Sequence, residues 1–274
     1  MKLYNLLIDG GVHLAADNGN GIRDLTAAGF PMNMDMLIRS NAVSEAESFL
    51  DNAPIIRNPV FSDIVNTPGK LICVGLNYRK HAEQAKMQTY NAPALFSKFS
   101  DALAPSGAEV ELPPWETTYD YEAELVIVIG KKAWGIALED ANQVIFGYTC
   151  GNDLSCRDAQ MRSGQWLIGK TMPGFAPCGP CIVTADGFLP AEGKSVRSYV
   201  NGELRQDGTT ADMIFSCEEI VSYASKYIGL EPGDLIFTGT PSGTALEGKK
   251  GWLKKGDTVE IEVEGIGRLI NKMI

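Results

Sequence analysis

Three carboxylates in the middle of the chain have the types and spacing of a metal site. In the stretch DYEAELVIVIG, residues 120–130, an apolar run from Leu125 to Ile129 indicates a buried strand. Residues two apart on a strand point to the same face, so the Cα atoms of Glu122 and Glu124 lie ~6.5 Å apart. Two like charges at the mouth of an apolar interior need a cation or protons to neutralise them.

A third carboxylate, Asp153, follows a second apolar strand, VIFGYT, in the polar cluster GNDLSCRD. A donor set made only of carboxylates favours a hard divalent ion such as Mg²⁺ or Mn²⁺, with Ca²⁺ as an alternative, and argues against zinc. From these residues alone one other interpretation stays open, in which the E-x-E pair caps the solvated end of a strand.

The elements that must position these carboxylates are mostly short strands. Helical spacing is present near residues 79–87, 139–145 and 216–228. Strands outnumber helices without a strict βαβ alternation, which predicts an α+β, β-dominated fold. From residue 70 onward, the clearest strand-like runs, bounded by Gly, Pro or Asp, are LICVGL (71–76), ELVIVIG (124–130), LIFTGT (235–240) and VEIEVEG (259–265).

The first part of the chain has a different texture. Two short strand-like pieces, KLYNLLI and GGVHLAA, precede residues 34–53, in which apolar side chains recur at roughly helical spacing. The turn formers Thr67, Pro68 and Gly69 then interrupt the pattern. We therefore expect a small N-terminal accessory domain over residues 1–66 and a larger catalytic domain over residues 70–274.

Composition and charge argue against several classes of protein. The 274 residues are 45% hydrophobic and 21% charged, which is enough to bury a large core. A net charge of −10 argues against nucleic-acid partners, because binding to a phosphate backbone needs a basic patch. No apolar run approaches the ~18 residues of a membrane span, and the N-terminus turns polar before a signal sequence forms. We expect a cytoplasmic protein that acts on a small organic substrate.

Six short motifs stand in a fixed order along the chain: VGLNYRKHA (74–82), DYEAELVIVIG (120–130), NDLSCRD (152–158), IGKT (168–171), VNGELRQ (200–206) and LEPGDLIFTGTPSG (230–243). In order and spacing they resemble the catalytic domain of the fumarylacetoacetate hydrolase family, over about residues 70–274. The resemblance implies a mixed β-sheet roll of that family's type, beside a small N-terminal α/β domain. It also implies a homodimer.

The resemblance assigns roles to the residues of the expected site. It implies a metal held by Glu122, Glu124 and Asp153, in agreement with the argument from the carboxylates themselves. At this metal, members of the family chelate a small 2-oxo acid through its carboxylate and keto oxygens, so the ion acts as a Lewis acid and an electron sink for an enolate. Lys170 matches the family's lysine beside the metal, which implies that it stabilises the developing oxyanion.

Three further residues match the family's substrate pocket. Arg157 and Gln160 match positions that face the substrate, and Thr240 matches a backbone turn that lines the pocket. Each has a plainer interpretation if the surrounding motifs are set aside. Arg157 would pair with Asp158 on the surface, Lys170 would lie in a solvated turn, and Thr240 would only shape its turn.

His81 matches the family histidine that takes a proton from the attacking water. Such a base needs a partner that fixes its tautomer, and hydrolase members carry a glutamate three residues after it. This chain has Gln84 there, which can orient an imidazole but cannot stabilise the imidazolium electrostatically. Glu83, two positions after His81 on a helix, should point elsewhere. The other histidine, His13, is expected at the surface.

These residues lead to one main function and two alternatives. The main hypothesis is a metal-dependent hydrolase that cleaves a C–C bond in an acylpyruvate-like β-dicarbonyl acid, with His81 activating water and Lys170 holding the enolate. The first alternative is a lyase or isomerase on a related acid, by oxaloacetate decarboxylation, oxo-diacid isomerisation or a ureidoglycolate-type cleavage. The second is a catalytically weak member that only binds a 2-oxo acid.

Two motifs suggest chemistry that their context argues against. Cys178-Gly-Pro-Cys181 has the sequence of a redox motif, but a β-rich run follows it where a reactive thiol would need a helix N-terminus. We expect both cysteines to be small buried hydrophobes at the entry of a strand, and all six cysteines to be reduced. Residues 243–249 have the spacing of a phosphate loop, but Lys250 stands where Ser or Thr is needed, so we expect a turn.

Overall fold

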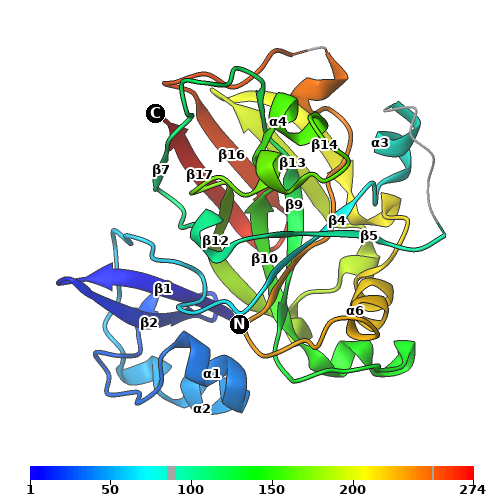
Figure 1. The fold of residues 1–274 in the computed structure, drawn as a ribbon. Helices are drawn as coiled ribbons and strands as arrows, with labels where there is room; N and C mark the ends of the chain where they lie inside the picture. The colour runs from blue at the N-terminus through cyan, green and yellow to red at the C-terminus, as the bar shows by residue number, and fades with distance from the viewer. Residues whose placement is uncertain (85–90, 249) are drawn as a thin grey trace.

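The computed structural model describes residues 1–84, 91–248 and 250–274, and the side chain of Gln84 lies outside this description. A large mixed β-sheet carries most of the expected site (Figure 1). Its strands are β1 Lys2–Ile8, β2 Gly11–Asp17, β3 Arg23–Asp24, β4 Leu71–Gly75, β5 Ala94–Lys98, β6 Leu103–Ala104, β9 Ala123–Ile129, β10 Ile145–Asn152, β12 Ala176–Thr184 and β15 Leu235–Phe237. They lie in the order β3, β2, β1, β12, β10, β9, β15, β4 and β5, with β6 beside β12. The pairs β15–β4 and β12–β6 are parallel, whereas β9 is antiparallel to both of its neighbours.

A second sheet packs against the centre of the first. Its strands are β7 Glu109–Val110, β13 Ser195–Val200, β14 Glu203–Thr209, β16 Thr258–Val263 and β17 Gly267–Met273, in the order β14, β13, β16, β17, β7. In it β13 and β16 contact β9, while β17 contacts β12. A short pair, β8 Tyr119–Asp120 and β11 Ser155–Cys156, lies beside the site.

Strand β9 has a hydrophobic core on each of its faces. Leu125, Ile127 and Ile129 pack into the core between the two sheets, and Val126 and Val128 pack into the core on the opposite side. Both sets are fully buried. A strand buried on both faces reads as a continuous apolar run, which is the pattern that predicted it.

The N-terminal segment continues the large sheet. β1 pairs with β12 through Lys2 and Leu3, so residues 2–24 extend the same sheet at its edge (Figure 1, blue). The expected helical region over residues 34–53 is divided into α1 Met34–Ser40, α2 Val43–Ser48 and the 3₁₀ helix η1 Leu50–Asn52. It breaks at Asn41, which adopts a left-handed conformation with φ of 53°. The domain boundary after residue 66 stays a prediction.

Short helices complete the fold. The expected helix over 216–228 is α6 Cys217–Ser225, which begins with a capping box between Ser216 and Glu219. The expected helical stretch over 139–145 is a 3₁₀ helix, η3 Leu138–Val144, and of the stretch over 79–87 the structure describes α3 Arg79–Gln84. The remaining helices are α4 Arg157–Met161, α5 Leu167–Lys170 and the 3₁₀ helices η2 Ser100–Ala102, η4 Ala185–Gly187, η5 Pro190–Glu192, η6 Thr210–Asp212 and η7 Ala245–Glu247. Among the described residues, no helix combines the length and the hydropathy needed to cross a bilayer.

The architecture confirms the expected α+β, β-dominated fold class, and each of the four named strand-like runs contains a strand. All six cysteines are free and buried, as expected. Cys178 and Cys181 lie within β12, in the interior of the strand and not at its entry. Burial raises the pKa of the Cys181 thiol to about 11, so neither position nor acidity suits disulfide exchange.

Candidate active site

A cavity of about 410 Å³ brings the expected site residues together at one end of the large sheet. It is lined by polar side chains from β9, α4 and α5 and by a rim of apolar ones that includes Leu76, Met161, Trp166 and Leu246. Another hollow, of about 660 Å³ beside β5, contains none of the expected site residues. The expected residues that line the smaller cavity are His81, Glu122, Glu124, Asp153, Arg157, Gln160, Lys170 and Thr240.

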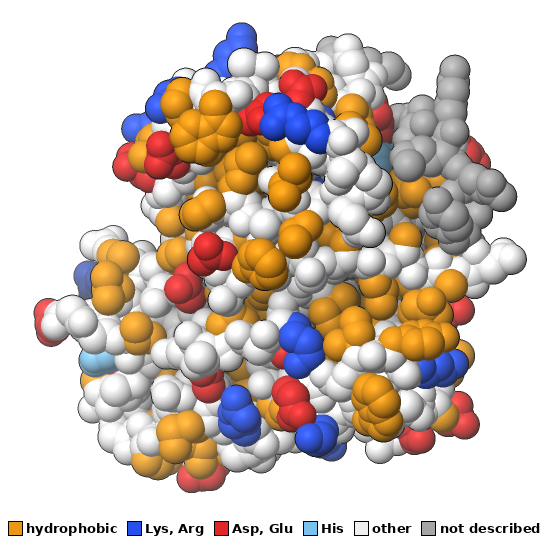
Figure 2. Space-filling view, viewed as in Figure 1, with side chains coloured by type: hydrophobic (Ala, Val, Ile, Leu, Met, Phe, Trp, Pro, Cys, Tyr) orange, Lys and Arg blue, Asp and Glu red, His pale blue; other side chains and the backbone are white. Residues whose placement is uncertain are grey.

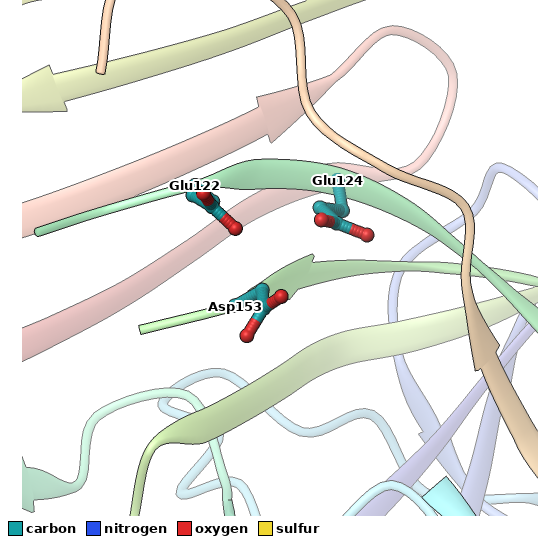
Figure 3. Close-up of side chains that lie close together, drawn as sticks. All are labelled: Glu122, Glu124 and Asp153. Carbon is teal, nitrogen blue, oxygen red and sulfur yellow. The ribbon is translucent and has the colours of Figure 1, made fainter. Parts of the chain in front are cut away.

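The three carboxylates converge as their spacing predicted (Figure 3). Glu122 lies directly before β9, Glu124 is the second residue of β9, and Asp153 follows the end of β10, the antiparallel neighbour of β9. The backbone N–H of Asp153 donates to the carbonyl of Glu122 at 3.0 Å, which fixes the alignment of the two strand ends. One oxygen from each carboxylate lies within 4.8 Å of the others, and all three residues are buried.

Two cations compensate Glu122. Lys170 Nζ lies 2.6 Å from Glu122 Oε2 and 2.8 Å from Asp153 Oδ2, and Arg157 Nη2 lies 2.6 Å from Glu122 Oε1. Burial alone would raise the pKa of Glu122, but the charges of Arg157 and Lys170 outweigh burial and hold this pKa well below its usual range. Lys170 is 2% exposed, which excludes the solvated-turn interpretation.

Glu124 has no cationic side chain within ion-pair distance in the described part of the chain. One of its oxygens, Oε2, accepts the backbone N–H of Gly239 at 2.7 Å. Burial, followed by the charges of Asp153 and Glu122, raises the pKa of Glu124 well above its ordinary value. Without a further cation, the protonated form of this carboxyl group is therefore more favoured than in an ordinary glutamate.

Lys98 is a site residue that the sequence reasoning missed. Its side chain is fully buried at the end of β5, and Nζ lies 2.6 Å from Asp153 Oδ1. The ammonium group directs its hydrogen bonds to the carbonyls of Leu154, Lys170 and Phe175. Asp153 Oδ1 itself accepts no hydrogen bond from the described residues. The only signal in the sequence is a lysine at the end of the strand-like run ALFSK.

The donor set fits a hard divalent cation. The three carboxylates supply oxygen ligands only. Among the described residues, Asp153 Oδ1 contacts Lys98 but accepts no hydrogen bond, and Glu124 has no cationic side chain within ion-pair distance. Oxygen donors of this kind suit Mg²⁺, Mn²⁺ or Ca²⁺. A bound divalent ion would also counteract the burial and the charge repulsion that raise the pKa of Glu124.

Arg157 is held on all sides by polar groups of the protein. Its Nε donates to Asp120 Oδ2 at 2.8 Å, and its Nη1 donates to Gln160 Oε1 at 2.9 Å. The side chain is buried, so a surface pair with Asp158 is excluded. Arg157 thus orders Glu122 and Gln160 at the cavity wall. Within the described part of the chain, no group accepts a hydrogen bond from the amide nitrogen of Gln160.

Thr240 lines the cavity, but its hydroxyl is used within the protein. Thr240 Oγ1 donates to the carbonyl of Ala123 at 2.9 Å and accepts from Gln206 Nε2 at 2.8 Å. Gln206 Oε1 in turn accepts the N–H of Ala123 at 2.9 Å. These bonds tie the start of β9 to the turn after β15, so the Thr240 side chain shapes the pocket.

His81 pairs with a glutamate that the sequence reasoning missed. Its Nδ1 lies 2.8 Å from Glu247 Oε1, and both side chains are 9% exposed. Glu247 Oε2 accepts the N–H of Gly243 at 2.7 Å, which orients the carboxylate. Gln84, the expected partner, has its side chain outside the described residues, and Glu83 is exposed.

This pairing prepares His81 to accept a proton. An ionised carboxylate only accepts hydrogen bonds, so the hydrogen of the neutral ring lies on Nδ1 and Nε2 keeps its lone pair. The stretch from Gly243 to Glu247, set aside above as a false phosphate loop, is the turn that supplies the carboxylate. His13 is partly buried and pairs with Asp24 at 2.8 Å, in the N-terminal segment.

The cavity therefore unites three functions: a carboxylate set for a divalent cation, a lysine that can stabilise an oxyanion, and a histidine–glutamate pair that can move a proton. Burial weakens the screening of these charges by water. Such an arrangement suits the formation of an enolate from a 2-oxo acid.

Known proteins resemble this chain over nearly all of its length. The "Fumarylacetoacetate hydrolase domain-containing protein 2 homolog" of Dictyostelium discoideum is 39% identical over 274 residues, covering 93% of this chain and 90% of that protein. The "Oxaloacetate tautomerase FAHD2A, mitochondrial" of Homo sapiens is 36% identical over 276 residues, covering 96% of this chain and 88% of that protein.

Solved structures share the fold. The fumarylacetoacetate hydrolase of psychrophilic Exiguobacterium antarcticum matches with a TM-score of 0.90 and 33% identity, over 100% of this chain and 99% of that one. The fumarylpyruvate hydrolase of Pseudomonas aeruginosa, solved with Mn²⁺ and pyruvate, matches with a TM-score of 0.69 and 35% identity, over 76% of this chain and 90% of that one. The family model "Fumarylacetoacetate (FAA) hydrolase C-terminal" matches residues 70–274. With the fold, the motifs and these relatives in agreement, the chain belongs to the fumarylacetoacetate hydrolase family of enzymes.

Proposed function

We propose that this protein is a divalent-metal-dependent enzyme that interconverts the keto and enol forms of a small 2-oxo diacid of the oxaloacetate type. The observation that carries the proposal is the His81–Glu247 pair, which opens onto the same cavity as the three carboxylates. Enolisation needs a base at carbon 3 and positive charge at the keto oxygen, and this cavity supplies both. The relatives named as oxaloacetate tautomerases support the choice of substrate.

His81 is the base in the proposed reaction. Its Nε2 takes a proton from carbon 3 of the keto form, while Glu247 at Nδ1 stabilises the imidazolium that results. Lys170 faces the negative charge that develops on the keto oxygen. Burial acts to lower the pKa of Lys170, but the charges of Asp153 and Glu122 outweigh it and raise this pKa, so the ammonium stays charged. The enol forms when the oxygen of the enolate takes up one proton and the imidazolium of His81 releases one, so that the interconversion gains and loses no net proton.

Glu122, Glu124 and Asp153 would hold the metal, for which we propose Mn²⁺ or Mg²⁺. When bound, such an ion supplies Lewis-acid polarisation of the keto group. The relative solved in complex with Mn²⁺ and pyruvate supports both the type of ion and a 2-oxo acid as ligand. We propose that Gln160 contacts the substrate through its amide nitrogen, beside the backbone turn at Thr240.

Hydrolysis of a C–C bond is the second candidate. The same pair of His81 and Glu247 can take a proton from water, and the carboxylate partner removes the weakness that Gln84 suggested for such a base. The likeness to the fumarylpyruvate hydrolase favours it. Its substrate would be an acylpyruvate, cleaved to a carboxylic acid and the enolate of a smaller 2-oxo acid.

Assays with two substrates separate these reactions. With Mn²⁺ or Mg²⁺ present, the tautomerase accelerates the decay of the enol absorbance of oxaloacetate without releasing pyruvate or CO₂. A decarboxylase releases both, and a hydrolase instead consumes acetylpyruvate and releases acetate. The proposal expects the first result and no acceleration after the metal is removed with a chelator.

The chain offers a matched control for the proposed base, because it contains only two histidines. His81→Ala should abolish the acceleration, and His13→Ala should leave it intact. Binding of oxalate to the metal-loaded protein without turnover of either substrate would contradict the proposal and favour a protein that only binds 2-oxo acids.

Two further proposals concern the setting of the enzyme. A homodimer is proposed from the family resemblance, and light scattering of the purified protein tests it. Several relatives are named as mitochondrial, so the cytoplasmic location expected from the sequence stays a proposal. Fractionation of the source cells tests the location.

A further inference from the structure

Asp120 stands between the two halves of the candidate active site. It is fully buried at the end of β8, two residues before Glu122. Its two oxygens accept hydrogen bonds from the side chain of Arg157 on one side and from backbone N–H groups of the turn η7 on the other, and Oδ1 also accepts the N–H of the next residue, Tyr121, at 2.9 Å. Asp120 neither belongs to the carboxylate cluster nor lines the cavity.

On one side, Asp120 fixes Arg157. Arg157 Nε lies 2.8 Å from Asp120 Oδ2, and Nη2 lies 2.7 Å from the same oxygen. Since Nη2 also contacts Glu122 at 2.6 Å, the guanidinium is held between two carboxylates. Asp120 thereby balances part of the positive charge that Arg157 places beside the metal ligands.

On the other side, Asp120 orders the turn that carries Glu247. Oδ1 accepts the N–H of Ala245 at 2.7 Å, and Oδ2 accepts the N–H of Leu246 at 3.0 Å. These are the first two N–H groups of η7, and the preceding residue, Thr244, provides no side-chain cap. An aspartate distant in sequence therefore takes the place of a local cap, directly before the residue that contacts His81.

We propose that Asp120 is a positioning residue that couples the metal-binding carboxylates to the proton-transferring pair. Through Arg157 it sets the charge and position of Glu122, and through η7 it holds Glu247 against His81. This inference rests on the proposed function for its catalytic consequence, but not for its two physical consequences, which are metal affinity and the tautomer of His81.

Asp120→Asn is the main test variant. An amide keeps the size of the side chain, but its NH₂ group must face donors that the carboxylate oxygens accepted. We expect Mn²⁺ affinity, measured by isothermal titration calorimetry, to fall by about fivefold, because a negative charge is lost near the ion. We expect kcat to fall by roughly 10- to 100-fold with a smaller change in KM, because the base loses its fixed partner.

The tautomer of His81 gives a readout that needs no activity. Long-range ¹H–¹⁵N spectra identify which ring nitrogen carries hydrogen, and a His13→Gln variant assigns the second histidine. The wild type should show one Nδ1–H tautomer for His81. Asp120→Asn should show a mixture of tautomers, because η7 no longer holds Glu247 in one position.

Asp234→Asn is the matched control. Asp234 is also fully buried, pairs with Lys70 at 2.8 Å and accepts backbone N–H groups from Lys70 and Glu231. It lies directly before β15, at the opposite end of this strand from the candidate active site. Loss of this carboxylate should lower stability while leaving Mn²⁺ affinity and the His81 tautomer unchanged. A change in Mn²⁺ affinity and tautomer that occurs in Asp120→Asn but not in Asp234→Asn therefore reports on the positioning of the site and not on a general loss of stability.

A second variant covers the case in which Asp120→Asn does not fold. Ala245→Pro removes one N–H that Asp120 Oδ1 accepts and places the proline ring against that oxygen, so it separates Asp120 from η7. It should disturb the His81 tautomer and change Mn²⁺ affinity less than Asp120→Asn does, because the negative charge of Asp120 is kept.

A double-variant cycle tests whether Asp120 acts through Glu247. In a Glu247→Gln background, Asp120→Asn should cost less than about threefold in kcat, well below its cost in the wild type. Additive losses, or a folded Asp120→Asn variant that matches Asp234→Asn in affinity and tautomer, would overturn the inference. If the wild type turns over none of the substrates, the proposed function fails, and the affinity and tautomer readouts still decide on Asp120.

Discussion

His81 Nδ1 lies 2.8 Å from Glu247 Oε1, although 166 residues separate the two in the chain. The pair forms because α3 follows β4, which is the parallel neighbour of β15, and η7 follows the turn after β15. Residues that follow neighbouring parallel strands emerge at the same edge of a sheet. The histidine thus gains a carboxylate partner from a segment that looks like a simple turn in sequence.

Glu247→Gln should lower kcat by roughly 100-fold and leave Mn²⁺ affinity unchanged. A glutamine still accepts the hydrogen of Nδ1, but it does not stabilise the imidazolium formed during proton transfer. The measurement is steady-state kinetics at saturating metal, together with calorimetric titration of the metal. Glu83→Gln is the control, since this exposed glutamate belongs to the same helix as His81. Equal activity of the two variants would remove Glu247 from the proposed mechanism.

Metal binding should release a proton and tighten as the pH rises above the ordinary glutamate pKa. The raised pKa of Glu124 means that the metal-free protein keeps a proton that an unfolded glutamate loses near a pKa of about 4.3. The stabilisation from that proton is complete below the unfolded pKa and is lost as the pH rises through the folded value. A divalent ion needs the ionised carboxylate and so displaces the proton.

Calorimetric titration of Mn²⁺ in two buffers with different ionisation enthalpies measures this proton release. Glu124→Gln should bind the ion weakly and without proton release, whereas Asp158→Asn, at an exposed position on α4, should behave as the wild type. Binding of equal strength from pH 5 to pH 8 would contradict the assignment of Glu124 as a ligand.

Lys98→Met should destabilise the fold by about 3–5 kcal/mol, because it leaves Asp153 without one of its cations and frees three buried carbonyl groups. For a chain of this size, that loss lowers the melting temperature by roughly 6–15 °C. Lys132→Met is the control, because its pair with Glu231 is solvent-exposed and its loss should leave the melting temperature nearly unchanged. Differential scanning calorimetry compares the two variants. Similar melting temperatures would contradict the proposed contribution of Lys98 to the stability of the fold.

The cysteines should react slowly in the native protein. Burial raises the pKa of Cys181 to about 11, and burial also raises the pKa of Cys178. At pH 8 the reactive thiolate of Cys181 is therefore a fraction on the order of 0.001, and it should increase about tenfold with each pH unit up to pH 10. Titration with a chromogenic disulfide should detect six thiols after unfolding and less than one within minutes before it. A fast native thiol would revive the redox interpretation of Cys178 and Cys181.

Much of the site was readable from local sequence patterns. The apolar run of β9 predicted a buried strand, and a period of two placed Glu122 and Glu124 on one face of it. Asp153 joined them because it follows the neighbouring strand. These inferences succeed because strand geometry is local: a few residues decide the direction of each side chain.

Other parts of the site depend on contacts that no local pattern encodes. Glu247, Lys98 and Asp120 reach the site from separate turns and strand ends, and each lies among residues that look ordinary in sequence. The same holds for the break at Asn41, where a left-handed residue divides an expected helical stretch. Only the assembled sheet decides which strand ends are neighbours.

The sequence by itself determined the strands, the carboxylate cluster and the family motifs, because each rests on spacing within a short segment. The tertiary structure decided which charges compensate one another: Lys98 at Asp153, Asp120 at Arg157 and Glu247 at His81. The physical reason is that a buried charge needs a partner in space, and the pairing of distant strands brings those partners together.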